Sequence, residues 1–527
     1  MPIKNRITSL LAGWVFTLAS LSAEEKKAPP NILIILADDL GYSDLHCFGG
    51  PIETPNLDSL AENGLRLTQF YNTARCWPTR TALMTGYYYP QVRRKGSQRQ
   101  MLPNYLAPLG YRNYHSGKWH VFETSPTRHG GFNRSFYTNN YDRFFTDEGH
   151  RLDGEQLPSK GRTEGYYVTK DIARRAIGFL GEHAEGNSDS PFLLYLAFTS
   201  PHFPLQALEE DIAKYEGKFA HGWDEERKRR QRRLKDIGLL DVDYAPRDEG
   251  LTASWTMSQS DLKTEIHPGE TRWAVAWDTL SDEEKAYQAT KMAIHCAMVD
   301  RMDQEIGEVI AQLKKMGSFE DTLIVFFSDN GASSEQLNRG EKNTLGSKLG
   351  SADSYLCLGA GWSTAANTPF RLHKHWAYEG GISSPFIAHW PAGIAAKGQV
   401  NHTPAHVIDL LPTFVDLAGG RLESEVEQPE LLGKSLVSLL KGEGVPEREV
   451  LYWNHEGNQA LREGDWKLAR SKRYLGDRWE LYNLAEDRGE RVDLASEHPE
   501  RVERMEKRWQ EMTVQFEEDH NFTNSVE

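Results

Sequence analysis

Oxygen-bearing side chains follow two strongly apolar runs of the sequence. Asp38 and Asp39 come directly after NILIILA, and Asp329 and Asn330 follow TLIVFF and a serine. Adjacent carboxylates repel each other, so Asp38 and Asp39 require a cation or contact with water, although a turn or helix cap is also compatible with the pair alone. Three carboxylates and an amide oxygen suit one hard divalent cation, Ca²⁺ or Mg²⁺, whereas zinc fits a set without Cys or His poorly.

Cationic and titratable side chains occur in three further polar clusters at predicted strand or turn ends. These clusters are HSGKWH, TSPHFP and FRLHKHW, and they contain Lys118, His120, His202 and Lys374. Each residue alone is compatible with a surface charge or a capping residue. Together they suit a tetrahedral oxyanion ester, because cations bind its equatorial oxygens and a titratable group protonates its leaving group.

Cys76 occupies an unusual position in the stretch ARCWPTR. Pro78 favours the first turn of a helix, which places Cys76 at the helix N-terminus, where backbone N–H groups and the helix dipole favour an anion. Arg80, one turn further on, points back toward the same end. A thiolate nucleophile, a buried thiol and half of a disulfide are three interpretations, but a thiolate matches a hard oxygen-liganded metal poorly.

The elements that position these residues alternate along the chain. Short apolar runs predict strands at Asn31–Ala37, Pro191–Phe198, Thr322–Phe327 and, more weakly, Leu109–His115 and Pro385–His389. Helical patterns lie at Asn56–Gly64, Val168–His183, Leu280–Met316 and His406–Ala418. This alternation predicts an α/β fold with a large, mostly parallel sheet flanked by helices. The carboxyl ends of parallel strands line one crevice, so we expect the polar clusters to meet there.

Two segments depart from this alternation. Ala220–Asp278 is polar and irregular and is interpreted as an excursion from the core. From Arg448 onward, short alternating strands and a final amphipathic helix at His498–Phe516 predict a small antiparallel sheet subdomain with a helix. We therefore expect a catalytic α/β domain over residues 30–440 and a small C-terminal α+β subdomain over residues 445–527.

The N-terminus has the order of a secretory signal peptide. Lys4 and Arg6 precede the apolar run Ile7–Leu21, and small residues end at Ala23, which predicts a signal peptide over residues 1–23. A membrane anchor is the alternative, but the run is shorter than the roughly 20 residues of a spanning helix. The sequence thus predicts an exported protein, periplasmic or extracellular, with no membrane span in the mature chain.

Composition excludes several classes of protein. A formal net charge of −15 argues against nucleic acid as a partner. The basic stretch Glu226–Lys235 is interpreted as a solvated helix face rather than a polyanion site. Four scattered cysteines do not form a disulfide scaffold, and the pairing of Cys47, Cys296 and Cys357 stays open.

Taken together, the motifs resemble a known family. CWPTR resembles the C-x-P-x-R signature of the type I sulfatases, in which the cysteine is oxidised to Cα-formylglycine. NILIILADDLGYSDL, TPNLDSLAENGLRLTQFY, GYRNYHSGKWH, SPHFPL, LIVFFSDNGAS and NTPFRLHKHWAYEGGISSPFIAHWPAGI resemble further blocks of the family, in the same order. The chain is similar to bacterial arylsulfatases of the alkaline phosphatase superfamily, and this resemblance implies an alkaline-phosphatase-like fold.

The resemblance also implies a metal site and a modification. Asp38, Asp39, Asp329 and Asn330 would bind one Ca²⁺ per chain, Mg²⁺ being less suitable, and the modified Cys76 would complete the coordination shell. A formylglycine-generating enzyme would be the maturation partner, and a sulfated small molecule or glycan would be the substrate.

Roles for the remaining site residues follow from the same resemblance. Arg80 would stabilise the formylglycine, and His120 would contact its hydroxyl. Lys118, His202 and Lys374 would bind the sulfate and assist the leaving group. One hydroxyl of the hydrated aldehyde would attack the ester sulfur while His202 or Lys374 protonates the departing alcohol. The second hydroxyl would then lose its proton with help from His120, reform the aldehyde and expel sulfate.

Four residues depart from commoner family members. His373 and His375 flank Lys374 where small residues are frequent, and Ser383 and Ser384 replace the usual Arg-Val. These departures change the substrate side of the pocket, so aryl and carbohydrate sulfate esters both remain open. The alternatives to a sulfatase are a phosphonate monoester or phosphodiester hydrolase of the same superfamily and a non-catalytic binder of sulfated glycans.

Overall fold

The computed structural model describes residues 28–95, 98–138, 143–394, 397–422 and 428–522. The predicted signal peptide, residues 1–23, lies outside the described residues. Within them, no helix combines the length and the apolar character that crossing a membrane requires.

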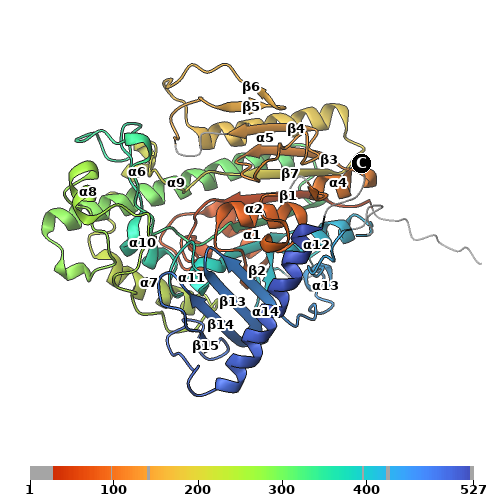
Figure 1. Ribbon diagram of the computed structural model, residues 1–527. Helices are drawn as coiled ribbons and strands as arrows, with labels where there is room; N and C mark the ends of the chain where they lie inside the picture. The colour runs from red at the N-terminus through yellow and green to blue at the C-terminus, as the bar shows by residue number, and fades with distance from the viewer. Residues whose placement is uncertain (1–27, 96–97, 139–142, 395–396, 423–427, 523–527) are drawn as a thin grey trace, which may run out of the picture.

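The apolar run Asn31–Ala37 forms strand β1 in the middle of an eleven-stranded sheet (Figure 1). The strand order is β10 (Gln399–Asn401), β2 (Leu65–Tyr71), β9 (Ser383–His389), β8 (Thr322–Ser328), β1, β7 (Phe192–Ala197), β3 (Arg112–Gly117), β4 (Arg134–Thr138), β5 (His150–Leu152) and β6 (Glu155–Gln156), and β11 (Ala405–His406) also pairs with β2. The pairs from β8 through β1, β7 and β3 to β4 are parallel, which confirms the predicted mostly parallel sheet. The predicted strand at Pro385–His389 exists as β9, but it runs antiparallel to both neighbours.

Alternate residues of β1 face two hydrophobic cores, one on each side of the sheet. Leu33 and Ile35 belong to the first core, whereas Ile32 and Ile34 belong to the second, and all four are fully buried. Burial on both faces explains why this strand is a continuous apolar run rather than an alternating one.

Helices cover both faces of the sheet. The first core includes residues of α1 (Pro55–Glu62), α5 (Val168–Gly186) and α9 (Asp282–Lys315), and the second includes residues of α2 (Cys76–Thr85), α4 (Leu102–Leu106), α12 (Leu410–Leu417) and α14 (Pro499–Asn521). The shorter helices are α3 (Tyr89–Val92), α6 (Glu209–Ala213), α8 (Gln259–Asp261), α10 (Gly359–Ala366), α11 (Glu379–Ile382) and α13 (Val437–Leu440). The long helix α9 begins at a capping box in which Ser281 and Glu284 bind each other's backbone N–H.

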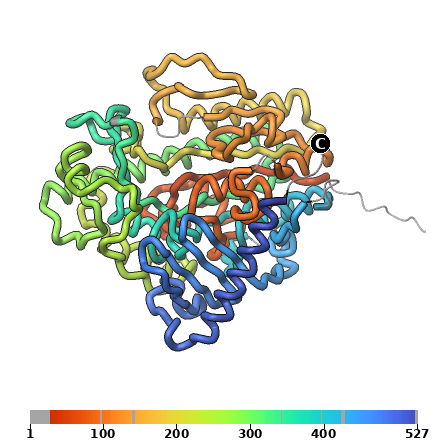
Figure 2. The backbone as a smooth tube through the Cα atoms, viewed as in Figure 1, coloured from red at the N-terminus to blue at the C-terminus, as the bar shows by residue number. Residues whose placement is uncertain are grey.

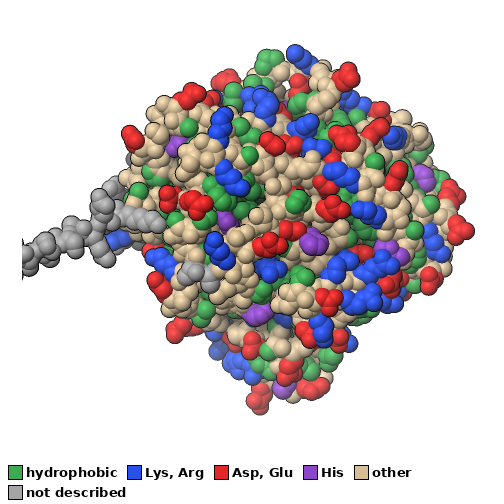
Figure 3. All heavy atoms as spheres, turned by 180° about the vertical axis from the view of Figure 1, so that it is seen from behind, with side chains coloured by type: hydrophobic (Ala, Val, Ile, Leu, Met, Phe, Trp, Pro, Cys, Tyr) green, Lys and Arg blue, Asp and Glu red, His purple; other side chains and the backbone are tan. Residues whose placement is uncertain are grey.

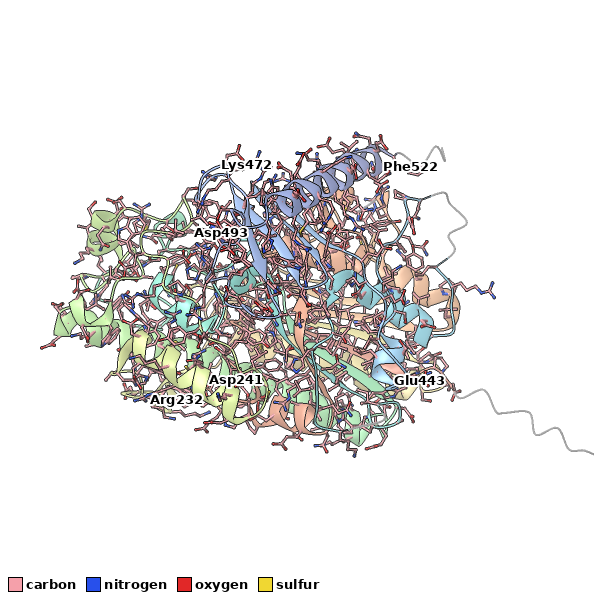
Figure 4. The ribbon with its side chains drawn as sticks, turned by 90° about the horizontal axis from the view of Figure 1, so that it is seen from below. Arg232, Asp241, Glu443, Lys472, Asp493 and Phe522 are labelled. Atoms are coloured by element: carbon pink, nitrogen blue, oxygen red, sulfur yellow. The ribbon has the colours of Figure 1, made fainter. Side chains whose placement is uncertain are left out.

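The polar excursion contains helix α7 (Gly222–Asp236), and the prediction that its basic stretch is a solvated face is wrong in part. Arg230 is fully buried and lies 2.9 Å from Asp44 and 3.2 Å from Glu226. Arg232, in contrast, lies at the edge of the molecule in Figure 4 with most of its side chain exposed. In the face shown in Figure 3, acidic side chains lie among and around the basic ones.

A second, four-stranded sheet forms near the C-terminus. Its antiparallel strands are β12 (Leu451–His455), β13 (Asn458–Glu463), β14 (Trp466–Ser471) and β15 (Glu480–Asn483). Figure 2 shows this segment packed against the N-terminal part of the chain. Tyr452 and Leu461 extend the second core of the large sheet, and α14 covers the small one with Trp509 and Phe516. The predicted antiparallel sheet with a covering helix is confirmed.

Candidate active site

The four oxygen-bearing residues meet because β1 and β8 are hydrogen-bonded neighbours. Their register pairs Ala37 with Ser328, so Asp38 and Asp329 leave the sheet side by side. The backbone N–H of Asp329 donates to Ala37 at 3.2 Å, and that of Asp39 donates to the Asp329 carboxylate at 3.3 Å. None of these four residues is more than 3% exposed.

The chemistry of this group fits a hard cation. Oδ1 of Asp38 and Oδ1 of Asn330 are buried and make no hydrogen bond within the described residues. One ligand atom each from Asp38, Cys76 and Asp329 lies within 4.8 Å of the others. Burial, reinforced by the charge of Asp329, raises the pKa of Asp38 although Lys118 acts in the opposite direction. A divalent cation would relieve both the repulsion and the desolvation of these carboxylates.

Cys76 is the first residue of helix α2, as its distance from Pro78 predicts. The residue is 4% exposed, and burial raises the pKa of its thiol although Lys118 and Lys374 lower it. A low-pKa thiolate nucleophile is therefore disfavoured. All four cysteines of the chain are buried free thiols, so the disulfide interpretation of Cys76 is excluded.

Arg80 lies one turn after Cys76 and is fully buried. Its Nε donates to Oδ2 of Asp329 at 2.9 Å, and its Nη2 lies 3.7 Å from Oδ1 of Asp38. Its Nη1 donates to the backbone carbonyl of Lys118 at 3.1 Å. Arg80 thus connects the start of α2 with the ends of β8, β1 and β3.

Each of the two adjacent carboxylates, Asp38 and Asp39, has its own lysine partner. Nζ of Lys118, just after β3, lies 2.5 Å from Asp38, and Nζ of Lys374 lies 2.8 Å from Asp39. Burial raises the pKa of Asp39, but Lys374 and His202 outweigh this effect and the pKa is lowered. Both ammonium groups are placed where an anionic substrate at Cys76 would meet them.

The two predicted histidines are neutral in this environment. Nδ1 of His202 donates to the Phe203 carbonyl at 2.6 Å, which leaves Nε2 facing Asp39 at 3.8 Å. Burial lowers the pKa of His202 to about 4 despite the nearby carboxylates. His120 follows Lys118 with a left-handed φ of 50°, and burial together with Lys118 lowers its pKa well below its usual value.

The structure adds residues that sequence reasoning missed. Glu335 is 2% exposed and lies 3.2 Å from Lys374 and 3.4 Å from Arg75, while Trp255 donates its indole N–H to it at 2.6 Å. The sequence signal that could have indicated Glu335 is its place at the end of SDNGASSE, the oxygen-rich stretch that begins at the last residue of β8. Trp255 comes from the polar excursion, where no pattern indicated a link to the site.

The residues that depart from commoner family members have different environments in the structure. His373 lies within 3.0 Å of the Ser363 hydroxyl in the interior, and the Ser384 hydroxyl accepts the N–H of Ser328 within the sheet. His375 instead stacks edge-on against Trp255 with ring centres 4.9 Å apart. Of the residues at which the sequence departs from commoner family members, His375 therefore lies beside Trp255, which donates to Glu335.

Known proteins resemble this chain in sequence and in fold. The family described as Sulfatase matches residues 30–420, and N-sulphoglucosamine sulphohydrolase, C-terminal, matches residues 370–517. An uncharacterized sulfatase of Schizosaccharomyces pombe is 31% identical over 92% of this chain and 93% of its own, and an arylsulfatase of Klebsiella aerogenes is 28% identical over 74% and 87%. The crystal structure of Ps i-CgsB superposes with a TM-score of 0.66 at 23% identity, covering 94% of this chain and 96% of that one. The chain therefore belongs to the sulfatase family of the alkaline phosphatase superfamily and is a sulfuric ester hydrolase.

Proposed function

We propose that the protein is exported and releases inorganic sulfate from an aryl or carbohydrate sulfate ester through a formylglycine derived from Cys76. One Ca²⁺ would be held by Asp38, Asp39, Asp329 and Asn330. The observation that carries this proposal is that buried carboxylate oxygens of Asp38 and Asp329 lie within 4.8 Å of the Cys76 sulfur, at the first turn of α2. The bacterial and animal relatives include arylsulfatases and sulfatases of amino-sugar sulfates, which supports both substrate classes.

When bound, Ca²⁺ would supply positive charge that activates the nucleophilic hydroxyl and offsets the charge of the sulfate. The side chains of the protein would bind the sulfate and position the reacting residue. Lys118 and Lys374 hold ammonium groups beside the carboxylate pair, where they would bind the sulfate oxygens. Arg80 would keep residue 76 and Asp329 in fixed positions relative to each other. A hydrated aldehyde would let residue 76 release its sulfate by reforming C=O, a route closed to serine or unmodified cysteine.

His202 and Lys374 are the candidate donors to the departing alcohol. Nε2 of His202 has no proton in the neutral form, because Nδ1 donates to a carbonyl. Lys374 stays protonated, because burial lowers its pKa but Asp39 and Glu335 outweigh burial and raise the pKa above its usual value. For one of them to act as the donor, substrate binding would have to protonate Nε2 of His202 or lower the pKa of Lys374. The pH profile of kcat would show which of the two groups donates the proton.

The burial of Cys76 also bears on maturation. With 4% of the residue exposed, a formylglycine-generating enzyme could not reach the thiol in the folded protein. We therefore expect this partner to act on the chain before it folds.

The decisive experiment is peptide mass spectrometry across Cys76, combined with sulfate release from aryl sulfates and a panel of sulfated sugars. We expect the aldehyde at residue 76 and no turnover by Cys76→Ala. Active enzyme that carries only a free thiol would contradict the formylglycine mechanism. Matched aryl phosphodiesters and phosphonate monoesters serve as the comparison substrates, and faster turnover of those would contradict the assignment of a sulfate ester as substrate.

A further inference from the structure

A second group of potential metal ligands lies next to the proposed active site. His375 follows Lys374 directly, His455 is the last residue of β12, and Glu456 lies in the turn between β12 and β13. One side-chain ligand atom from each residue lies within 4.8 Å of the other two. We call these three residues the His375 cluster. It contains none of the carboxylates that we assign to Ca²⁺.

The distances within the His375 cluster are those of ligands around one ion. Nδ1 of His375 lies 3.3 Å from Oε2 of Glu456, and Nε2 of His455 lies 3.6 Å from the same oxygen. A tetrahedral zinc ion with bonds of about 2.0–2.1 Å separates its ligands by about 3.3 Å. The cluster therefore needs only small side-chain adjustments to surround a zinc ion.

The imidazoles of the His375 cluster lack the hydrogen bonds that buried polar groups normally make. Both ring nitrogens of His375, which is fully buried, and Nε2 of His455, which is 8% exposed, make none within the described residues. Buried side-chain nitrogens usually have a partner, and a metal ion would take one nitrogen of each imidazole as its ligand. The Glu456 side chain is 42% exposed, and it provides a path from solvent.

The protonation state of the histidines suits metal binding. Burial, assisted by the charge of Arg75, lowers the pKa of His375 to about 3 and that of His455 well below its usual value. Neutral imidazoles present the lone pair that a metal requires. Arg75 would repel a dication, but its guanidinium lies 3.4 Å from Glu335, which offsets part of its charge.

Aromatic side chains surround the His375 cluster. The Trp255 ring lies 4.9 Å from the His375 ring, and the Trp77 ring lies 5.2 Å from the His455 ring. Lys472, which Figure 4 labels near the edge of the small sheet, donates its backbone N–H to Gly457 at 3.1 Å and so holds the turn that carries Glu456. The apolar shell would limit the access of solvent to a bound metal, and the hydrogen bond from Lys472 holds the turn that carries the Glu456 ligand.

We propose that His375, His455 and Glu456 form a second metal site that takes Zn²⁺ or a similar borderline dication, with a fourth position open to water. Two neutral imidazoles and one carboxylate are zinc ligands, whereas the oxygen-only site at Asp38 suits Ca²⁺. A bound ion would tie the segment of Lys374 to the small C-terminal sheet. The proposal does not depend on the formylglycine mechanism.

The test is metal binding by the mature full-length protein in a Cys76→Ala background, which keeps zinc from a thiol beside the carboxylates. The protein is stripped with a chelator, saturated with Ca²⁺ and titrated with Zn²⁺, and bound zinc is counted by elemental analysis after desalting. Co²⁺ serves as a second probe, because two imidazoles in a tetrahedral site give intense visible absorption that an oxygen-only site does not give. We expect one equivalent of zinc and the tetrahedral cobalt spectrum.

Variants assign this equivalent to its ligands. His455→Ala and Glu456→Gln are expected to lose the bound zinc, and Glu456→Gln lies on an exposed turn where folding is little affected. His46→Ala is the matched control, because His46 forms a surface pair with Asp58 at 2.9 Å. Zinc retained by His455→Ala, or no zinc bound by the parent protein, would overturn the proposal. Unchanged zinc binding in the Cys76→Ala background would also overturn it if the same substitutions, made in the active enzyme, raise the KM for the sulfate ester, because the cluster would then be a substrate contact.

Discussion

Arg80 places two nitrogens on the same carboxylate oxygen of Asp329, with Nε at 2.9 Å and Nη2 at 2.8 Å. Both side chains are fully buried. The pair joins the first turn of α2, which carries Cys76, to the end of β8, which carries the proposed metal ligands. The position of residue 76, the proposed nucleophile, relative to the proposed metal ligands thus depends on one planar guanidinium.

Arg80→Lys is expected to lower kcat for sulfate release by about 10²–10³-fold, because an ammonium cannot bind both carboxylates and a backbone carbonyl in one plane. Steady-state kinetics on an aryl sulfate measure the effect. Arg232→Lys is the control, since 65% of that arginine side chain is exposed. Arg80→Lys with the activity of the parent enzyme would contradict this role.

Removal of the proposed Ca²⁺ should destabilise the protein as well as inactivate it. Asp38, Asp39 and Asp329 are buried side by side, so EGTA is expected to lower Tm and Ca²⁺ to restore it. Calcium at a hundred times its Kd would add about 2.7 kcal/mol to the free energy of unfolding. Calorimetry with and without Ca²⁺ is the measurement. Asp329→Asn should show no such calcium effect, and a calcium-dependent Tm in this variant would argue against the ligand set.

Glu335→Gln tests the residue that only the structure revealed. Glu335 and Asp39 hold Lys374 from two sides, so the variant should lose about 10–100-fold in kcat/KM while its affinity for Ca²⁺ stays unchanged. Glu335→Asp should recover part of the loss, because it keeps the charge. If both variants match the parent in kcat and in KM, Glu335 does not position Lys374.

Glu226→Gln tests the buried charges of α7. Burial raises the pKa of Glu226, but the hydrogen bond from His221 and the charges of Arg230 and Arg233 outweigh burial and lower the pKa to about 2. Because the folded pKa lies below the usual 4.5, the ionised group stabilises the fold above that value by at most about 3 kcal/mol. This stabilisation is lost as the pH falls from 4.5 toward 2.

The measurement is the free energy of unfolding of the parent and Glu226→Gln at several pH values. We expect the variant to be less stable by about 2–3 kcal/mol at pH 7, with the difference shrinking below about pH 4. Glu443→Gln, on an exposed loop labelled in Figure 4, should match the parent at every pH. A difference that does not change with pH would show that packing, and not charge, makes Glu226 important.

Local patterns predicted five neighbouring strands of the eleven-stranded sheet: β9, β8, β1, β7 and β3. NILIILA coincides with β1, and the helix predicted at Leu280–Met316 is α9, because buried parallel strands and long helices carry strong hydrophobic patterns. The direction of β9 was not predictable, since an apolar run has the same pattern in parallel and antiparallel sheets. The burial of Arg230 was also missed, because a charged residue is normally assigned to the surface.

The amino-acid sequence alone predicts which side chains stand at the ends of β1 and β8 and that Cys76 begins a helix, because strand period, proline and helix geometry are local properties. The contact of Arg75 with Glu335, 260 residues away, and that of His455 from the small sheet with His375 are visible only in the folded chain. Contacts between distant segments depend on how whole elements pack, and no local period records them.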